Sequence, residues 1–391
     1  MNEKMEYAAQ AKTIWNRNFI IALFGYFFLF MSVTVFFLFP LFLKQFNPSL
    51  SRIGLIMGVH SLMAIVVRPF FGRLMDIKGR KGISLFGIAL LIVILPGFHL
   101  ISDAGVLPLI LRALTGIGWG ISMTATMTIC SDLAPVERLA HSMGIIGVAG
   151  LISSALGPLL AEEIIRRFGF GALFNTSFIF LLGSFFCILL TREVIKLNHA
   201  GHFHKPKHLL NFSVIVILLI SAMPVVHGAV RGAVINFIAL FGKSIPLERV
   251  GPFFVSFSAA AVLTRLGLGG LSDRFGRKQV VFPAACLISF NLILISQVHS
   301  FWLFVLTGLI GGFGQGLIFP ALSTYIIDIL GRENKGLAIS LYLALFDVGM
   351  GFGSVFFGWV SDLYGYRIMY LVAGGILFLA ASVFTWKAPS S

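Results

Sequence analysis

The chain has 391 residues, of which 58% are hydrophobic and 11% charged. Because soluble domains carry charge on about a quarter of their residues, this composition excludes an ordinary soluble protein. The net charge of +14 could suggest nucleic acid as a partner. Lysine and arginine, however, concentrate in loops predicted to lie on one side of a membrane, as the positive-inside rule describes. We therefore expect no nucleic-acid partner and contact with anionic membrane lipid instead.

Apolar segments long enough to cross a bilayer recur along the whole chain. They predict twelve membrane-spanning helices, near residues 18–43, 51–75, 82–101, 107–131, 141–165, 171–191, 211–240, 250–272, 279–298, 301–327, 336–360 and 366–386. The polar stretch 192–210 separates an N-terminal bundle, residues 1–191, from a C-terminal bundle, residues 211–391. We expect this stretch and both termini in the cytoplasm. Its closely spaced histidines predict a solvated linker rather than a metal site, since no cysteine or carboxylate lies among them.

A short charged phrase at the end of the second span recurs 197 residues later, at the end of the eighth. The first copy is Arg68, Gly72, Asp76, Gly79, Arg80 and Lys81, and the second is Arg265, Gly269, Asp273, Gly276, Arg277 and Lys278. A repeat of half the chain predicts two homologous bundles related by a pseudo-two-fold axis. In each copy the first glycine should permit close helix contact, the aspartate should meet a helix N-terminus or an arginine, and Gly-Arg-Lys should turn the chain. Together the two copies predict a conformational latch.

The fourth span carries a ladder of small residues that the tenth span repeats. The equivalent pairs, offset by 196, are Gly116 and Gly312, Gly118 and Gly314, Gly120 and Gly316, and Asp132 and Asp328. Glycines at this spacing let helix backbones approach closely, although each lowers helix stability. Their clustering on equivalent spans predicts interfaces that move.

Ionisable residues inside the predicted spans are candidates for proton coupling, because a charge in the bilayer is costly. Asp347 is an acid near the middle of the eleventh span, where it could accept a proton or, alternatively, bond a backbone group or an arginine. His227 and Arg231 share a face of the seventh span. Arg231 could bind an anionic substrate or neutralise Asp347, and the alternative is a structural pair near the membrane surface.

Aromatic and polar side chains on the first, fourth, seventh and tenth spans could line a substrate cavity. The candidates are Tyr26, Phe30, Trp119, Met123, Arg231, Asn236 and Gln315. An aromatic wall would favour an apolar or amphipathic substrate, whereas ordinary helix packing is the alternative for each residue. At the end of the fifth span, Glu162 and Glu163 should form surface ion pairs with Arg166 and Arg167.

The repeated phrase resembles the signature loop, motif A, of the major facilitator superfamily, and the resemblance covers the whole chain. Arg112, with Gly116 and Gly118, is similar to motif B, whose arginine is implicated in proton coupling; Leu309 stands at its position in the second half. Part of the fifth span resembles motif C of drug–proton antiporters, with serine in place of one glycine. The matching residues are Gly144, Ser153, Gly157 and Pro158.

The resemblance implies an all-α integral membrane fold with two six-helix bundles, a small-molecule substrate bound between them, and alternating access. It favours proton-coupled export, as in bacterial sugar- and drug-efflux permeases, with Asp347 carrying the proton and Arg112 and His227 tuning it. Uptake by symport or facilitated diffusion is the first alternative, and a transport-incompetent sensor or scaffold is the second. We expect no cofactor, no enzyme activity and a functional monomer, since no P-loop, zinc motif or catalytic triad is recognisable.

Overall fold

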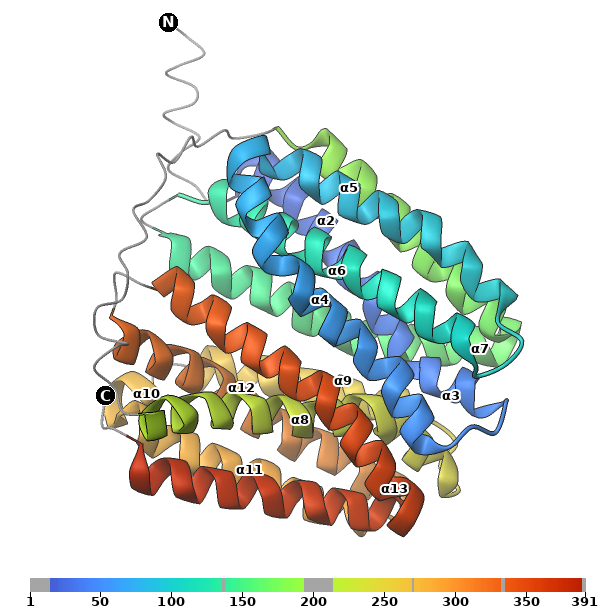
Figure 1. Cartoon of the computed structure of the whole chain (residues 1–391), viewed down its shortest axis with the longest axis vertical. Coiled ribbons are helices and arrows are strands. Elements are labelled where there is room, and N and C mark those ends of the chain that lie inside the picture. The colour runs from blue at the N-terminus through green and yellow to red at the C-terminus, as the bar shows by residue number, and fades with distance from the viewer. Residues whose placement is uncertain (1–14, 136–137, 193–213, 269–270, 332–334, 389–391) are drawn as a thin grey trace, which may run out of the picture. The chain divides into compact units, whose positions relative to one another are not determined.

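The structure, a computed structural model, describes residues 15–135, 138–192, 214–268, 271–331 and 335–388, and within these ranges the regular elements are all helices (Figure 1). In chain order they are α2 (Arg17–Thr34), η1 (Val35–Leu38), α3 (Phe39–Lys44), α4 (Leu50–Lys78), α5 (Arg80–Ile94), η2 (Leu95–Leu100), α6 (Val106–Asp132), α7 (Leu139–Leu190), α8 (Val214–Ser244), α9 (Gly251–Leu268), α10 (Leu271–Phe275), α11 (Arg277–Ser296), α12 (Phe301–Leu330) and α13 (Lys335–Lys387).

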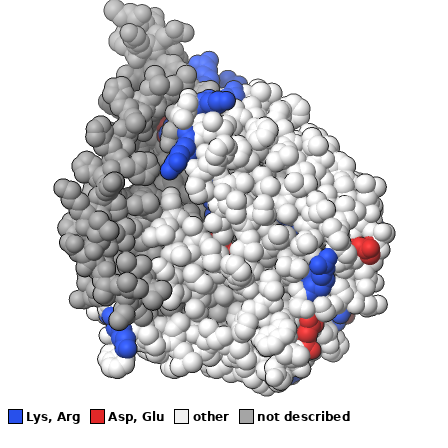
Figure 2. Space-filling model, in the orientation of Figure 1, with Lys and Arg blue, Asp and Glu red and all other residues white. Residues whose placement is uncertain are grey.

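Ten stretches of helix in the described residues are long and apolar enough to cross a membrane. Many large apolar side chains on them are exposed, among them Val93, Trp302 and Leu379. On the face drawn in Figure 2, most of the described surface carries no charged side chain. An apolar exterior of this kind is stable against lipid and not against water.

Two of these stretches, α7 and α13, each consist of two helices joined at one glycine. Gly169 has φ 77° and ψ −179°, and Gly365 has φ 78° and ψ 169°, values that break the helical hydrogen-bond pattern. A continuous helix of 52 residues would measure about 78 Å, far more than the roughly 30 Å of hydrocarbon. The left-handed region that both glycines occupy is strained for any residue with a Cβ.

The chain forms two compact units that differ from simple sequence halves. Met1–Phe36 and Met63–Gly201 form unit 1, and Phe37–Leu62 and His202–Ser391 form unit 2, so far as the structure describes these ranges. Helix α4 therefore begins in unit 2 and ends in unit 1. The division of the sequence into bundles at residues 191 and 211 stays a prediction.

In unit 1, α2 packs along α7 and α5 packs along α6. Serine hydroxyls of α7 donate to carbonyl oxygens of α2: Ser184 to Gly25 at 2.9 Å and Ser177 to Ser32 at 2.8 Å. Hydrogen bonds between helices hold them together in a lipid environment, where burial of apolar surface gives little driving force.

The glycine ladders make the close helix contacts that their spacing predicts, in both units. A Cβ added to Gly118 would lie 2.8 Å from the Leu91 side chain of α5, and one added to Gly120 would press on Ala64 of α4. In unit 2, Gly314 faces Ile288 of α11 and Gly316 faces Ala261 of α9. Each partner in unit 2 lies 197 residues after its counterpart in unit 1, so the contacts repeat along with the sequence.

In unit 2, α13 packs closely against two other helices, α8 and the first half of α4, and glycines make both contacts possible. Gly228 and Gly232 of α8 contact carbonyl groups of α13. From the other side, a Cβ on Gly54 or Gly58 of α4 would meet a carbonyl oxygen of α13, and one on Gly358 of α13 would meet Leu50. Backbone therefore rests directly on backbone along this junction, which we call the α4–α13 seam.

Candidate functional site

The two Gly-Arg-Lys turns have the same geometry in both units. Gly79 precedes α5 with φ 88° and ψ 155°, and Gly276 precedes α11 with φ 93° and ψ 150°. Positive φ at each glycine lets the chain reverse and start the next helix at once. The chain breaks between helices at both glycines, and the role of these turns in a latch stays a prediction.

The arginine of each turn pairs with an aspartate that sequence reasoning had noted only as part of the repeat. Arg80 donates to Asp132 at the end of α6, and Arg277 donates to Asp328 of α12, with Nε–Oδ2 at 3.0 Å. Both pairs are largely shielded from solvent. The arginine repeats after 197 residues and the aspartate after 196. This shared repetition is the feature of the sequence that could have predicted the two ion pairs.

Other members of the phrase remain predictions as parts of a latch. Within the described residues a Cβ on Gly72 would meet no atom within 4 Å, and the expectation that Gly72 permits close helix contact stays a prediction. Gly269 lies outside the described residues, as do the side chains of Asp76 and Asp273. Arg68 is half-buried on α4. The ammonium group of Lys278 donates to the carbonyl oxygen of residue 388.

Three of the predicted cavity residues form an aromatic cluster in unit 1. The rings of Tyr26 and Phe30 lie 4.8 Å apart, and Trp119 of α6 meets Phe30 edge-on at 5.0 Å. Met123 lies one turn after Trp119 and is half-buried. A cluster of this composition can accept an apolar group, and whether a substrate reaches it stays a prediction.

Arg112 and the segment similar to motif C both lie against α2 or the residues that follow it. The Arg112 guanidinium is buried and lies 5.9 Å from the centre of the Phe36 ring. Ser153 donates to the carbonyl of Phe27 at 3.3 Å and accepts, through its own carbonyl, a hydrogen bond from Thr34 at 2.9 Å. Gly157 touches Thr34, so its missing side chain is what allows this approach.

The two remaining motif C positions, Pro158 and Gly144, differ in what surrounds them. Pro158 lies inside α7 directly after Gly157. A Cβ on Gly144 would meet nothing within 4 Å among the described residues, so this glycine is not needed for packing there.

Unit 2 contains a buried polar cluster centred on His227. The Nε2 of His227 lies 2.8 Å from Oε1 of Gln315, and its Nδ1 lies 3.2 Å from the hydroxyl of Tyr342. An amide oxygen can only accept, so Nε2 donates and Nδ1 accepts from the tyrosine. All three side chains are at most 8% exposed. The sequence singled out His227 and Gln315 separately; nothing local to Tyr342 marked it as their partner.

Charged groups surround this hydrogen-bonded chain. Asp347 and Arg265 both act electrostatically on Tyr342, and Arg231 and Arg265 repel each other. The Arg231 guanidinium lies 4.2 Å from the centre of the Phe257 ring, which stabilises a cation that is out of water. Cations therefore outnumber carboxylates in the cluster.

Arg265 contributes to this cluster as well as to the repeated phrase. Its guanidinium lies 5.1 Å from the centre of the Phe319 ring on α12. One turn of α8 beyond the cluster, Asn236 donates to the Ser354 hydroxyl at 2.6 Å, which ties α8 to α13. The predicted cavity residues of unit 2 thus each contact another side chain of the unit: Arg231 contacts Phe257, Asn236 contacts Ser354 and Gln315 contacts His227. Their contact with substrate stays a prediction.

A further copy of the repeated phrase, overlooked in the sequence, lies on α13 as Gly358, Asp362 and Gly365 with the same spacing. The Asp362 carboxylate accepts backbone N–H groups of α4, from Leu50 at 2.6 Å and from Ser51 at 2.8 Å. A carboxylate at this position satisfies two of the donors that every helix N-terminus leaves without a partner. It closes one end of the α4–α13 seam.

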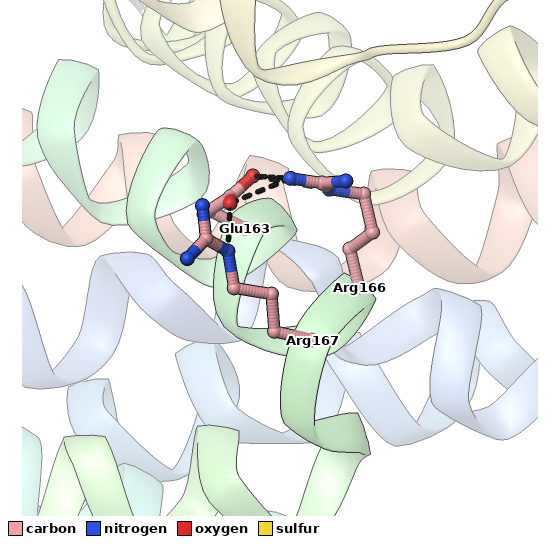
Figure 3. A network of polar contacts seen from close by, with 3 residues as sticks. All are labelled: Glu163, Arg166 and Arg167. Carbon is pink, nitrogen blue, oxygen red and sulfur yellow. Dashed lines mark hydrogen bonds and ion pairs between the residues drawn. The ribbon is translucent and has the colours of Figure 1, made fainter.

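Glu163 forms ion pairs of the kind predicted at the end of the fifth span. Figure 3 shows Glu163 of α7 between Arg166 and Arg167, which reach it from the next turn. All three side chains are exposed, so solvent screens these ion pairs and they contribute little to stability.

The described residues contain no group of three or more histidine, cysteine, aspartate or glutamate side chains able to hold a metal ion. The histidines of the central stretch lie outside the described residues.

Long apolar helices, interhelical glycine contacts and buried polar groups are those of a multi-pass membrane protein. The chain belongs to the Major Facilitator Superfamily, whose model matches residues 19–256 and 225–391. Membership in this family of transporters confirms that the chain carries a small-molecule substrate and is not an enzyme. It also confirms the resemblance drawn from the repeated phrase.

Curated bacterial relatives are similar over most of their length. The Multidrug resistance protein MdtG of Salmonella choleraesuis is 24% identical over 352 residues, which are 86% of this chain and 84% of that protein. The protein of the same name from Salmonella typhi is 25% identical over the same shares.

Solved structures share the fold at low identity. The nucleoside transporter NupG superposes with a TM-score of 0.80 at 12% identity, covering 94% of this chain and 99% of that one. A bacterial homologue of the human lysosomal transporter Spinster gives 0.80 at 15% identity, with shares of 94% and 96%. The human organic anion transporter MFSD10 gives 0.70 at 16% identity, with shares of 94% and 99%.

Proposed function

We propose that the chain exports a small organic molecule in exchange for protons by alternating access. The observation that carries the proposal is the buried chain from Gln315 through His227 to Tyr342, with Asp347 beside it. Ionisable and polar groups inside membrane segments are costly, and they mark proton or substrate pathways. The relatives named for multidrug resistance favour export, because a cell resists many drugs by removing them.

In this proposal Asp347 takes up and releases the proton, and Arg112 and His227 tune its affinity. Coupling requires that protonation stabilise one conformation of the transporter more than the other, since a ligand with equal affinity for both shifts nothing. Asp347 acts electrostatically on Tyr342, whose hydroxyl bonds the imidazole of His227, so a change of charge on Asp347 would alter this hydrogen bond.

We also infer twelve spans in two six-helix bundles of related structure, working as a monomer in a bacterial cytoplasmic membrane with both termini inside. Support comes from the breaks at Gly169 and Gly365, which divide each of two long helices into a pair. The glycine contacts support the relation between the bundles, because the glycines recur after 196 residues and their partners after 197. Residues 192–210 would then link bundles 1–191 and 211–391 on the cytoplasmic side.

The test uses purified protein in liposomes that contain a trapped pH-sensitive dye, with an imposed proton gradient. Lipophilic cations, sugars, amino acids and organic anions are added in turn. We expect one class to drive proton flux in the wild type, and Asp347→Asn to abolish this flux while exchange of substrate continues. Asp103→Asn, which alters an exposed loop carboxylate bonded to a backbone N–H, is the matched control and should behave as wild type.

Two results would count against this function. Unchanged driven transport in Asp347→Asn would remove the aspartate from the coupling step. Substrate movement without protons, or accumulation inward under an inward proton gradient, would indicate a facilitator or a symporter in place of an exporter.

A further inference from the structure

Helix α8 carries a guanidinium group at the depth of the bilayer centre. In the apolar span Ser221–Ser244, ten residues precede Arg231 and thirteen follow it, so it lies about 15–20 Å along the helix from either end. The hydrocarbon core is about 30 Å thick, which places this side chain near the midplane. Secondary transporters bind their substrates at this depth.

Arg231 lacks the kind of partner that holds two other arginines of unit 2. Arg277 forms an ion pair with a carboxylate, and Arg367 donates to two backbone carbonyl oxygens. Arg231 forms neither a hydrogen bond nor an ion pair within the part of the chain that the structure describes. Its neighbour is the ring of Phe257, 4.2 Å from the guanidinium carbon. A ring face stabilises the positive charge but offers the N–H donors no carbonyl or carboxylate oxygen.

This arrangement leaves an unmet need for an acceptor at Arg231. The side chain is half-buried, so it is not sealed inside the unit. An ionised group in a membrane segment is costly unless it is paired. Arg265 raises the cost, because its charge repels that of Arg231. A structural arginine would be bonded as Arg277 and Arg367 are, whereas an arginine that awaits a ligand would be left as Arg231 is.

We propose that Arg231 binds the anionic group of the transported molecule, which is an organic anion with an aromatic or apolar body. The planar guanidinium matches a carboxylate, sulfonate or phosphate through two parallel hydrogen bonds. Aromatic rings beside the cations would contact the body: Phe257 lies next to Arg231, and Phe319, which is half-buried, lies next to Arg265. This inference rests on the proposed transport of a small organic molecule and holds for either direction of transport.

The test measures exchange across liposomes that contain the full-length protein, at equal pH on both sides. Radiolabelled naphthalene-2-sulfonate is trapped inside, and unlabelled compounds are added outside. Naphthalene-2-sulfonate, naphthalene-2-sulfonamide and 2-naphthyltrimethylammonium share one ring system and are an anion, a neutral molecule and a cation. A second set built on biphenyl repeats the comparison. A sulfonate stays ionised at neutral pH, so it does not leak through the bilayer as a neutral acid.

The variants separate a role in anion binding from a role in structure. Arg231→Gln should raise the half-saturating sulfonate concentration at least about tenfold, because the charge-assisted hydrogen bonds are lost. Arg231→Lys keeps the charge and should keep the preference for the anion. Arg367→Gln is the matched control, since it removes the same charge from a carbonyl-bonded position of unit 2 and should change the value less than about twofold.

Sulfonate exchange that is weakened in Arg231→Gln and kept in Arg231→Lys and Arg367→Gln supports the proposal. Absence of sulfonate exchange in the wild type, equal or faster exchange with the trimethylammonium compounds, or unchanged affinity in Arg231→Gln overturns it. If Arg231→Gln fails to fold, the wild type decides: preference for the sulfonates supports the proposal, and no preference overturns it. No proton gradient is applied, so sulfonate exchange without proton flux would count against the proposed coupling and still support the anion site.

Discussion

Asp362→Asn should loosen the start of α4 without disturbing the rest of unit 2. The carboxylate accepts two backbone N–H groups, at 2.6 and 2.8 Å, from a helix that begins 312 residues earlier. An asparagine keeps one acceptor oxygen and loses the charge that favours the helix N-terminus. Helix caps of this kind contribute about 0.5–2 kcal/mol, and an exposed aspartate belongs in the middle of that range because solvent screens it. A loss of about 1 kcal/mol corresponds to about a fivefold change in a local opening equilibrium.

Hydrogen exchange at the amides of Leu50 and Ser51 measures this equilibrium directly. We expect exchange at these two amides to accelerate about fivefold in Asp362→Asn, and amides in the middle of α4 to change little. Glu163→Gln is the matched control, because it removes an exposed carboxylate that bonds arginine side chains on the next turn of its own helix. Unchanged exchange at Leu50 and Ser51, or equal acceleration in the control, would refute the capping role.

Two further predictions concern packing and the buried polar cluster. Gly118→Ala places a methyl group 2.8 Å from Leu91 and should lower the free energy of unfolding by about 1–3 kcal/mol, whereas Gly144→Ala, with open space around it, should not; thermal unfolding in detergent compares the two. Gln315→Leu removes the acceptor of the His227 Nε2–H and should cost about 1–3 kcal/mol while slowing proton-coupled flux. Gln315→Glu keeps an acceptor oxygen, so equal losses in both variants would contradict the assigned hydrogen bond.

Two kinds of signal in the sequence predicted structural features correctly: local residue patterns and the internal repeat. Apolar length predicts the membrane helices, and the turns at Gly79 and Gly276 follow from a glycine placed between an apolar span and a basic pair. The glycine ladder predicts close contacts because a bare Cα on a helix face leaves a groove for a neighbour.

The unpredicted contacts join residues that are distant in sequence. Tyr342 reaches His227 across 115 residues, and Asp362 reaches Leu50 across 312. Such partners are set by how the helices stack, which local hydropathy does not encode. The spacing of Gly358, Asp362 and Gly365 is visible in the sequence, but this copy lacks the basic pair that marks the other two.

The backbone contacts along the α4–α13 seam affect how fast α4 and α13 could separate. Interdigitated side chains must change rotamers before two helices separate, and each change adds friction and entropy loss on closing again. At Gly54, Gly58 and Gly358 the surfaces are nearly smooth backbone, so separation needs little more than entry of water or lipid. Resistance to separation would then be concentrated at the end of the seam where Asp362 caps α4. The rest of the seam would open and reclose quickly.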